Sequence, residues 1–308
     1  MNGYPYQLAK KGKIICPSCG QRTLVPYVDA SGQILHSTCG RCDREDKCGY
    51  HLPPRDYLKD HGAIQPQRPY NPPPPRPITF IKPEEVKASL YGYENNNLVK
   101  WLVGMVGEEK SIPVLSDYFV GTSSKFGGGS AIYWQIDEQK RIRTGKIMQY
   151  DFNGHRVKKP INQVAWVHSD IPDFTMKQCL FGSHLLSANH TFPVIVVESE
   201  KTALLLACIV EDAVILATGG ASNISLDLFR CLEGRNVALI PDNGKFEAWS
   251  DLARQLRSFC NSVVISPRME GPDVGEGEDI GDLFEKGIKS QERELTTNEQ
   301  WEEYLFNG

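Results

Sequence analysis

The strongest evidence for a fold is a regular alternation of apolar runs and amphipathic stretches after residue 190. Apolar runs at 193–197, 213–217, 236–240 and 262–266 alternate with helical patterns at 200–210, 224–232 and 246–259. Continuous runs rich in Val and Ile are typical of parallel strands whose two faces are covered by helices. We therefore expect an α/β domain over 191–308, with ligands at the carboxyl ends of its strands.

A proline-rich segment divides the rest of the chain. QPQRPYNPPPPRP, which ends at Pro77, excludes helix and central strand because proline fixes φ and lacks an N–H donor. We expect an N-terminal domain over 1–60, a stiff linker over 61–77 and a middle domain over 78–190. Recognition of the PxxP pattern by a partner protein is the alternative use of the linker.

The middle domain mixes helical and strand patterns. Helical patterns cover 83–91 and 97–105, and alternating strands cover 131–137 and 141–152, which together predict an α+β region. The glycine-rich GTSSKFGGGS lacks the GK[ST] end of a P-loop, so it predicts a flexible hairpin connection. At the end of the chain, TTNEQWEEYL contains a capping pattern that predicts a short helix.

Composition excludes several classes of protein. The chain has 308 residues and a hydrophobic fraction of 40%, as expected for a globular protein with a real core. It contains no apolar run long enough to cross a bilayer and no signal-peptide pattern at its start, so we expect a cytoplasmic protein without membrane contact.

The formal net charge of −4 is unlike that of a DNA-coating protein, so any contact with nucleic acid must be local. The segment RIRTGKIMQYDFNGHRVKK is the best candidate, because its basic residues alternate with apolar ones. These residues either contact phosphates or form a solvated sheet face. They are Arg141, Arg143, Lys146, Arg156, Lys158 and Lys159.

Five of the nine cysteines lie between Cys16 and Cys48, which indicates a metal site rather than disulfides in a reducing compartment. CPSCG supplies Cys16 and Cys19, and TCGRCDREDKCGYH supplies the other half of the site. Cys39 with Cys42 gives the symmetrical arrangement that spacing favours, whereas Cys42 with Cys48 gives a looser second half. Four protein ligands predict a structural Zn²⁺ in a β-ribbon, and so short and polar a segment needs such an ion to fold.

Acidic residues follow the predicted strands. VIVVESEK places Glu198 directly after one strand, PDNG places Asp242 after another, and GEDIGDLF supplies Asp279 and Asp282. Carboxylates gathered at one sheet edge repel one another unless a hard cation such as Mg²⁺ or Mn²⁺ neutralises them, and such cations commonly hold phosphates. The pattern predicts phosphoryl chemistry. The alternative is that the acids only cap the helices that follow them.

The order strand-Glu, strand-Asp and downstream Asp pair resembles TOPRIM domains, which occur in primases, topoisomerases and related nucleases. A zinc ribbon before such a domain is similar to the layout of bacterial and phage primases. Over nearly the whole chain, the phrases GRCDREDKCGYH, YWQID, GKIMQYD, WVHS, CLFGSHLL, VVESEKTALLLA and LATGG resemble an uncharacterised TOPRIM-like family of bacterial mobile elements. That resemblance implies a zinc ligand set of Cys16, Cys19, Cys42 and Cys48, with Cys39 left over.

The resemblance also implies roles for the acidic residues. Glu198 would act as general acid or base, while Asp242 and the pair Asp279 and Asp282 would hold the metal. Lys201 would steady a phosphate.

Two residues depart from the TOPRIM pattern, which has Gly after the glutamate and a second Asp two residues after the first. This chain has Ser199 and Gly244 at those places, so one metal ligand is missing. We therefore expect one of two functions. The first is metal-dependent nucleotidyl transfer on single-stranded DNA by a primase-like protein, and the second is a non-catalytic module that binds nucleic acid and recruits replication or mobilisation proteins. A TOPRIM nuclease is a third class.

Overall fold

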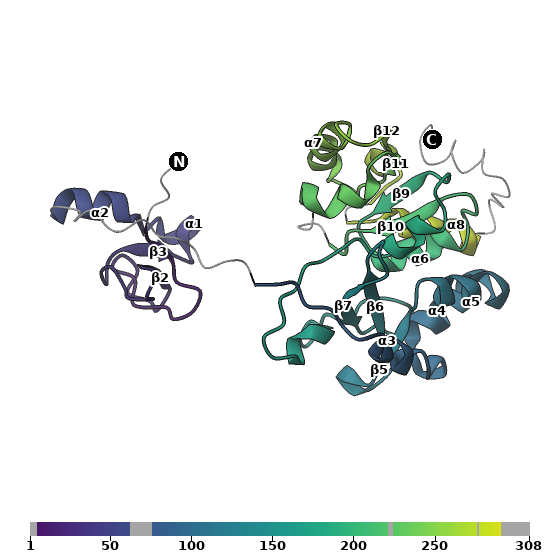
Figure 1. Cartoon of the computed structure of the whole chain (residues 1–308), viewed down its shortest axis with the longest axis horizontal. Helices are drawn as coiled ribbons and strands as arrows, with labels where there is room; N and C mark the ends of the chain where they lie inside the picture. The colour runs from purple at the N-terminus through teal and green to yellow at the C-terminus, as the bar shows by residue number, and fades with distance from the viewer. Residues whose placement is uncertain (1–4, 62–75, 221–223, 276, 291–308) are drawn as a thin grey trace. The chain divides into compact units, whose positions relative to one another are not determined.

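The computed structural model describes residues 5–61, 76–220, 224–275 and 277–290 (Figure 1). The chain divides into two compact units, residues 1–75 and residues 76–308. Most of the proline-rich linker and the whole of the predicted terminal helix lie outside the described residues. Among the helices that the structure describes, none has both the length and the apolar character that crossing a membrane requires.

The N-terminal unit is a small antiparallel ribbon with very little hydrophobic core. Its four strands pair in the order β1-β2-β3-β4, and two short helices accompany them. The strands are β1 (Gln7–Leu8), β2 (Leu24–Val28), β3 (Gly40–Cys42) and β4 (His51–Leu52), and the helices are α1 (Glu45–Cys48) and α2 (Pro54–His61). Within residues 5–61, the buried cluster consists of Cys16, Leu24 and Cys42, so apolar packing alone contributes little to the stability of this unit.

The C-terminal part contains the parallel sheet that the sequence predicts. The strands are β9 (Val194–Val197), β10 (Val214–Ala217), β11 (Asn236–Leu239) and β12 (Ser262–Ile265), in the order β10-β9-β11-β12. All three strand pairs are parallel. The helices are α6 (Glu200–Ala207), α7 (Phe246–Leu256) and α8 (Ile280–Ser290), and the stretch predicted as a helix at 224–232 forms the 3₁₀ helix Leu226–Leu232.

Helices cover both faces of this sheet, which explains the continuous apolar runs. On β9, Ile195 and Val197 pack with α6 and α8, whereas Val194 and Val196 pack with α7 on the other face. A strand with both faces covered has no solvent-exposed side to carry alternating polar residues.

The middle of the chain forms a second, antiparallel sheet in the order β5-β6-β7-β8. Its strands are β5 (Gly121–Ser123), β6 (Ser130–Ile136), β7 (Ile142–Met148) and β8 (Val164–Trp166), and its helices are α3 (Pro83–Ser89), α4 (Asn97–Val106) and α5 (Glu108–Asp117). The glycine-rich segment before β6 connects β5 to β6 as an antiparallel hairpin, as predicted. Further 3₁₀ helices lie at Tyr93–Asn95, Lys125–Gly127, Val167–Asp170, Ser183–Ser187 and Arg268–Glu270.

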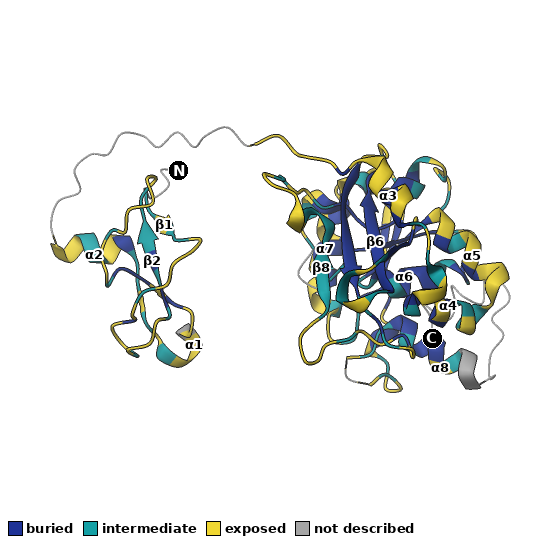
Figure 2. Ribbon diagram, turned by 90° about the horizontal axis from the view of Figure 1, so that it is seen from below, coloured by how far each residue is buried: buried dark blue, intermediate teal, exposed yellow. Residues whose placement is uncertain are grey.

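Every residue of β6 and β7 is buried, which corrects the expectation that the basic residues of β7 are free to contact phosphates (Figure 2). Arg143 Nε lies 2.7 Å from Asp137 Oδ2, and Lys146 Nζ lies 2.9 Å from Glu200 Oε2. Arg141 also pairs with Asp137, at 2.9 Å. These three cations are held by carboxylates of the fold itself.

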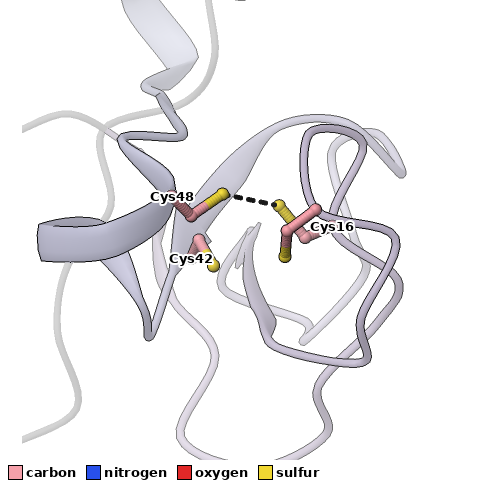
Figure 3. A group of neighbouring side chains, drawn as sticks. Cys16, Cys42 and Cys48 are labelled. Carbon is pink, nitrogen blue, oxygen red and sulfur yellow. Dashed lines mark hydrogen bonds between the residues drawn. The ribbon is translucent and has the colours of Figure 1, made fainter.

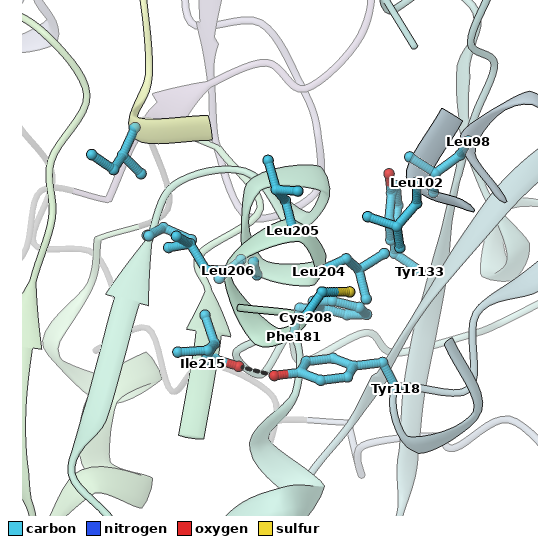
Figure 4. Packing of buried hydrophobic residues seen from close by; sticks show 14 of the residues in the cluster. Leu98, Leu102, Tyr118, Tyr133, Phe181, Leu204, Leu205, Leu206, Cys208 and Ile215 are labelled. Carbon is cyan, nitrogen blue, oxygen red and sulfur yellow. Dashed lines mark hydrogen bonds between the residues drawn. The ribbon is translucent and has the colours of Figure 1, made fainter. Parts of the chain in front are cut away.

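The two sheets contribute to a shared hydrophobic cluster, and each also packs in a cluster of its own. Residues of α4, β6, β9, α6 and α8 belong to the same buried cluster, part of which is drawn in Figure 4. The Tyr118 hydroxyl donates to the Ile215 carbonyl at 2.7 Å, and Phe181 forms a bridge with Ala217 at the edge of β10. Residue 190 lies between β8 and β9, where the chain passes from one sheet to the other.

Candidate functional site

Four cysteine sulfurs converge in the N-terminal unit (Figure 3). Cys16 and Cys19 lie in the turn before β2, Cys42 ends β3 and Cys48 ends α1. Their Sγ atoms all lie within 4.8 Å of one another, and those of Cys16 and Cys48 are 3.8 Å apart. Four thiolates at about 2.3 Å from a tetrahedral zinc ion would be separated by about 3.8 Å. The cluster therefore fits a structural zinc ion in both chemistry and spacing.

Neighbouring groups surround these ligands, and burial raises the pKa of Cys16 whereas a hydrogen bond from Ser18 lowers that of Cys48. The Thr23 hydroxyl lies 3.2 Å from Cys42 Sγ and 3.5 Å from Cys19 Sγ, and the Arg44 N–H donates to Cys42 Sγ at 3.4 Å. Hydrogen bonds, of which that from Thr23 is the largest, lower the pKa of the Cys19 thiol to about 6. Such donors orient the ligands and stabilise their negative charge.

Cys39 does not join this cluster. Its thiol donates to the Leu52 carbonyl at 3.4 Å, and burial raises its pKa to about 11. The symmetrical pairing that spacing alone favours is therefore wrong. Histidines in the same segment are also engaged elsewhere, since His51 hydrogen-bonds to the Tyr27 hydroxyl at 3.0 Å and His36 to the Thr38 hydroxyl at 2.8 Å.

The predicted acidic residues form a second cluster, in the C-terminal unit. Glu198 follows β9 directly, Asp242 follows β11, and Asp279 and Asp282 lie at the start of α8. Burial, and then the charges of Glu198, Asp279 and Asp282, raise the pKa of Asp242 to about 8. Burial and the charge of Asp282 also raise the pKa of Asp279. The fold thus places carboxyl groups from three separate segments at the carboxyl edge of the sheet, close enough to raise one another's pKa, whereas among the described residues only the four cysteines bring three or more ligand atoms within 4.8 Å of one another.

Asp279 and Asp282 also cap α8. The Asp282 N–H donates to Asp279 Oδ1 and the Asp279 N–H donates to Asp282 Oδ2, both at 3.0 Å, in a reciprocal capping box. The Thr202 hydroxyl donates to Asp279 Oδ2 at 2.8 Å. The capping alternative is therefore correct for the geometry of this pair, and the same pair contributes charge to the cluster. No sequence pattern links Thr202 to Asp279, because 77 residues separate them.

Of the two departures from the TOPRIM pattern, Gly244 has a local explanation and Ser199 does not. Gly244 has φ of 74°, a left-handed conformation that favours glycine, and its N–H donates to Glu270 Oε1 at 3.1 Å. Ser199 is the N-cap residue of α6, although its side chain makes no capping hydrogen bond.

Lys201 is held by the fold rather than extended toward solvent. Its ammonium lies 3.9 Å from the centroid of the Trp101 ring and 3.8 Å from Glu285 Oε2. It remains close enough to lower the pKa of Asp279. The arrangement places a cation beside the acidic cluster, with its ammonium engaged by an aromatic ring and a carboxylate.

Sequence reasoning missed a buried ion pair beneath this edge. Glu200 is 2% exposed and both its carboxylate oxygens accept from Lys146, which also donates to the Gly219 carbonyl at 2.8 Å. Gly219 has φ of 78°, and a Cβ there would lie 2.9 Å from Glu200 Oε1. The TGG segment after β10 is thus a tight turn over the ion pair. The pattern ESEK offered Glu200 as a candidate, but nothing in the sequence links it to β7.

Two protein-family models match separate parts of the chain. Residues 4–63 match a family model described as a zinc beta-ribbon finger. The N-terminal unit is a zinc ribbon. Residues 96–243, which include β9 and β10 but end before α8, match a family described as a domain of unknown function (DUF6371). No curated protein matches the chain.

Several solved structures are distantly similar. The E. coli primase catalytic core is 15% identical with a TM-score of 0.45, and the match covers 72% of this chain and 77% of that chain. The primase fragment of the bacteriophage T7 primase-helicase protein is 15% identical with a TM-score of 0.40, over 91% of this chain and 96% of that chain. An Aquifex aeolicus primase, with zinc-binding and RNA polymerase domains, is 14% identical with a TM-score of 0.38, over 65% and 60%. At such distances we base the function on the site's own residues.

Proposed function

We propose that this chain is a primase-like TOPRIM protein that acts on DNA and transfers nucleotidyl groups at the acidic cluster. The observation that carries the proposal is the convergence of Glu198, Asp242, Asp279 and Asp282, whose mutual repulsion and burial raise the pKa of Asp242 to about 8. A fold gains nothing from such repulsion by itself. A bound divalent cation would offset the repulsion between the carboxylates, which would account for their placement at one edge.

The four residues would divide the work by position. Asp242 and Asp282 present carboxylate oxygens suited to Mg²⁺ or Mn²⁺, and when bound such an ion would neutralise charge on a phosphate. Asp279 has one oxygen bound to the Asp282 N–H and the other to Thr202, so it is the more firmly positioned of the pair. Glu198, at the end of β9, would accept a proton from the attacking hydroxyl and return it to the leaving group.

The zinc ribbon would contribute template contact, and single-stranded DNA is the expected template. This part of the proposal follows from the resemblance to primases, as do replication or mobilisation partners and a mobile-element setting. None of these depends on the acidic cluster.

The decisive experiment is incorporation of labelled ribonucleotides on single-stranded DNA with Mg²⁺ or Mn²⁺. We expect product from the wild type and a loss of about a thousandfold in Glu198→Gln, because general acid–base catalysis contributes roughly 10²–10⁴ to rate. Glu211→Gln is the matched control, since Glu211 is exposed and precedes β10 at the amino end of the sheet. Equal activity in wild type and Glu198→Gln would refute the assignment.

A second function is favoured by one specific observation, the glycine at position 244. With no carboxylate there, the site has one ligand fewer than the TOPRIM pattern, so the chain would bind nucleic acid without catalysing a reaction.

Calorimetric titration with Mn²⁺ distinguishes the catalytic function from the binding function. If Glu198→Gln with Asp242→Asn leaves the titration unchanged while DNA binding persists, the binding module is the better description. Shortening of end-labelled single-stranded DNA, incubated under the conditions of the incorporation assay, would instead indicate a nuclease.

A further inference from the structure

The connection between β7 and β8 forms a compact hairpin that the acidic site does not use. Tyr150 and Arg156 form an antiparallel bridge. Between them, Asp151 Oδ1 accepts the N–H groups of Asn153 and His155, both at 2.9 Å, and the Asp151 N–H donates to the His155 carbonyl at 2.9 Å. The tip of the hairpin is therefore fixed by its own hydrogen bonds.

The hairpin presents an aromatic ring and three cations to solvent. Phe152 at its tip is 82% exposed, the largest fraction for any large hydrophobic side chain that the structure describes. Arg156, Lys158 and Lys159 are exposed, and no carboxylate within the described residues pairs with them. They differ in this respect from Arg141, Arg143 and Lys146, which lie on β7 or just before it and are all paired.

Packing ties the hairpin to the acidic cluster. Gly154 lies against the Trp101 ring so closely that a Cβ would come within 2.4 Å of it, and the same ring carries the Lys201 ammonium. The Asn97 amide donates to the Tyr150 carbonyl at 2.9 Å and fixes the hairpin's base to α4.

We propose that this hairpin, residues 150–159, binds single-stranded nucleic acid next to the acidic cluster, with a base stacked on Phe152 and backbone phosphates bound by Arg156, Lys158 and Lys159. The proposal rests on the function proposed above and specifies where its nucleic acid lies. An exposed aromatic face can stack only on a base that is free of its own neighbours, as in a single strand. Positive charge on an otherwise acidic chain supplies the complementary backbone contacts.

The test is the binding of fluorescently labelled oligothymidylate to the full chain, without added Mg²⁺ or Mn²⁺ and without chelator, so that zinc stays bound. Phe152→Ala should weaken binding about tenfold, because stacking on one aromatic ring is worth roughly that much for a single strand. Since Phe152 is so exposed, the substitution should leave the thermal unfolding temperature unchanged. Repeating the titration with oligouridylate distinguishes DNA from RNA as the preferred strand.

Charge is tested by the salt dependence of binding. Replacing Arg156, Lys158 and Lys159 together with Ala should reduce the slope of log K against log salt by about 2, since each phosphate contact contributes about 0.7 for a single strand. The control replaces Lys82, Lys87 and Lys110, three exposed lysines on or beside α3 and α5, and should change the slope much less. Equal slopes in the two triple variants would overturn the proposal.

A gain of signal complements these losses. Phe152→Trp should add fluorescence that oligothymidylate quenches, relative to the same titration of wild type. Unchanged fluorescence together with wild-type affinity of Phe152→Ala would overturn the proposal, as would quenching by anionic lipid vesicles but not by oligothymidylate. Because binding is measured without chemistry, it can fail while the Glu198-dependent incorporation persists, and it can succeed when incorporation is absent.

Discussion

The zinc ribbon and the acidic edge of the parallel sheet both gather side chains that become negatively charged, but they do so on very different supports. In the ribbon, the cysteines are themselves most of the buried cluster, alongside Leu24. In the larger unit, the carboxylates lie at the edge of two extensive cores that exist without them. Metal should therefore be required for folding in the first unit and only for function in the second.

The largest effect that this contrast predicts is loss of the ribbon in Cys16→Ser. Structural zinc contributes on the order of 10 kcal/mol to such small units, so removal of one ligand should unfold the ribbon and eliminate bound zinc. All five tryptophans lie after residue 75, so tryptophan fluorescence follows only the larger unit. The variant should bind no zinc, and the amides of residues 5–61 should lose their protection from hydrogen exchange. The urea midpoint measured by tryptophan fluorescence should stay at its wild-type value. A shifted midpoint would contradict the contrast.

The next effect concerns the larger unit, where packing and a buried ion pair hold the two sheets together. Lys146→Met should destabilise this unit by about 3–5 kcal/mol, because Glu200 is left charged and buried without its partner. The measurement is urea unfolding followed by tryptophan fluorescence. Adding Glu200→Leu should restore much of the loss. If the double variant is no more stable than the single, the cost arises from packing rather than from the unpaired charge.

A smaller effect is the pH dependence that the acidic cluster imposes. The pKa of Asp242 is about 8 in the folded chain and about 4 when unfolded, so the folded state binds the extra proton between these values. Stability should therefore fall as pH rises from about 4 to 8 in the absence of divalent cation. Asp242→Asn should remove this fall and be more stable than wild type at pH 8, by on the order of 2 kcal/mol after allowance for solvent screening.

Urea midpoints across this pH range, followed by tryptophan fluorescence, provide the measurement. A difference between wild type and Asp242→Asn that does not change with pH would show that carboxylate repulsion is not its cause. Added Mn²⁺ should reduce the difference at pH 8 if the cation binds the cluster.

The smallest effect is expected at Cys39. Its replacement tests whether this cysteine is only a buried thiol or is a zinc ligand. Cys39→Ala should keep one zinc ion per chain and cost the ribbon no more than about 1–2 kcal/mol, the range for a small loss of buried volume. Zinc content and thermal unfolding of the ribbon are the measurements. Loss of zinc in this variant would restore the symmetrical ligand set that spacing favours.

The parallel sheet was predictable from sequence because β9, β10 and most of β11 are buried and appear as uninterrupted apolar runs. Helix α5 was not predicted, since Pro113 lies inside it and its sequence EEKSIPVLSD shows no clear apolar face. Helix α8 was also not predicted, because the segment GEDIGDLF was interpreted only as a source of the carboxylates of Asp279 and Asp282.

The acidic residues were predictable as candidates because each follows a strand or precedes a helix, but their partners were not. Cys48 entered the predicted ligand set through resemblance rather than spacing, and the structure brings its sulfur to the cluster. The alternation in β7 correctly indicated a strand, yet Arg143 and Lys146 were assigned to solvent. The partner of Arg143 is Asp137, in the turn between β6 and β7, and the partner of Lys146 is Glu200 of α6, so no pattern within β7 itself reveals either carboxylate.

The capping box between Asp279 and Asp282 has a further consequence for how the acidic edge meets a ligand. Each carboxylate is anchored to the backbone N–H of the other, and Asp279 is anchored also to α6 through Thr202. The two side chains are thus pre-organised by the start of α8 before any ligand arrives. Binding then has little side-chain entropy left to remove at these positions. A ligand that pulled either carboxylate aside would have to unwind the first turn of α8, so occupancy of this edge and integrity of that helix are thermodynamically coupled.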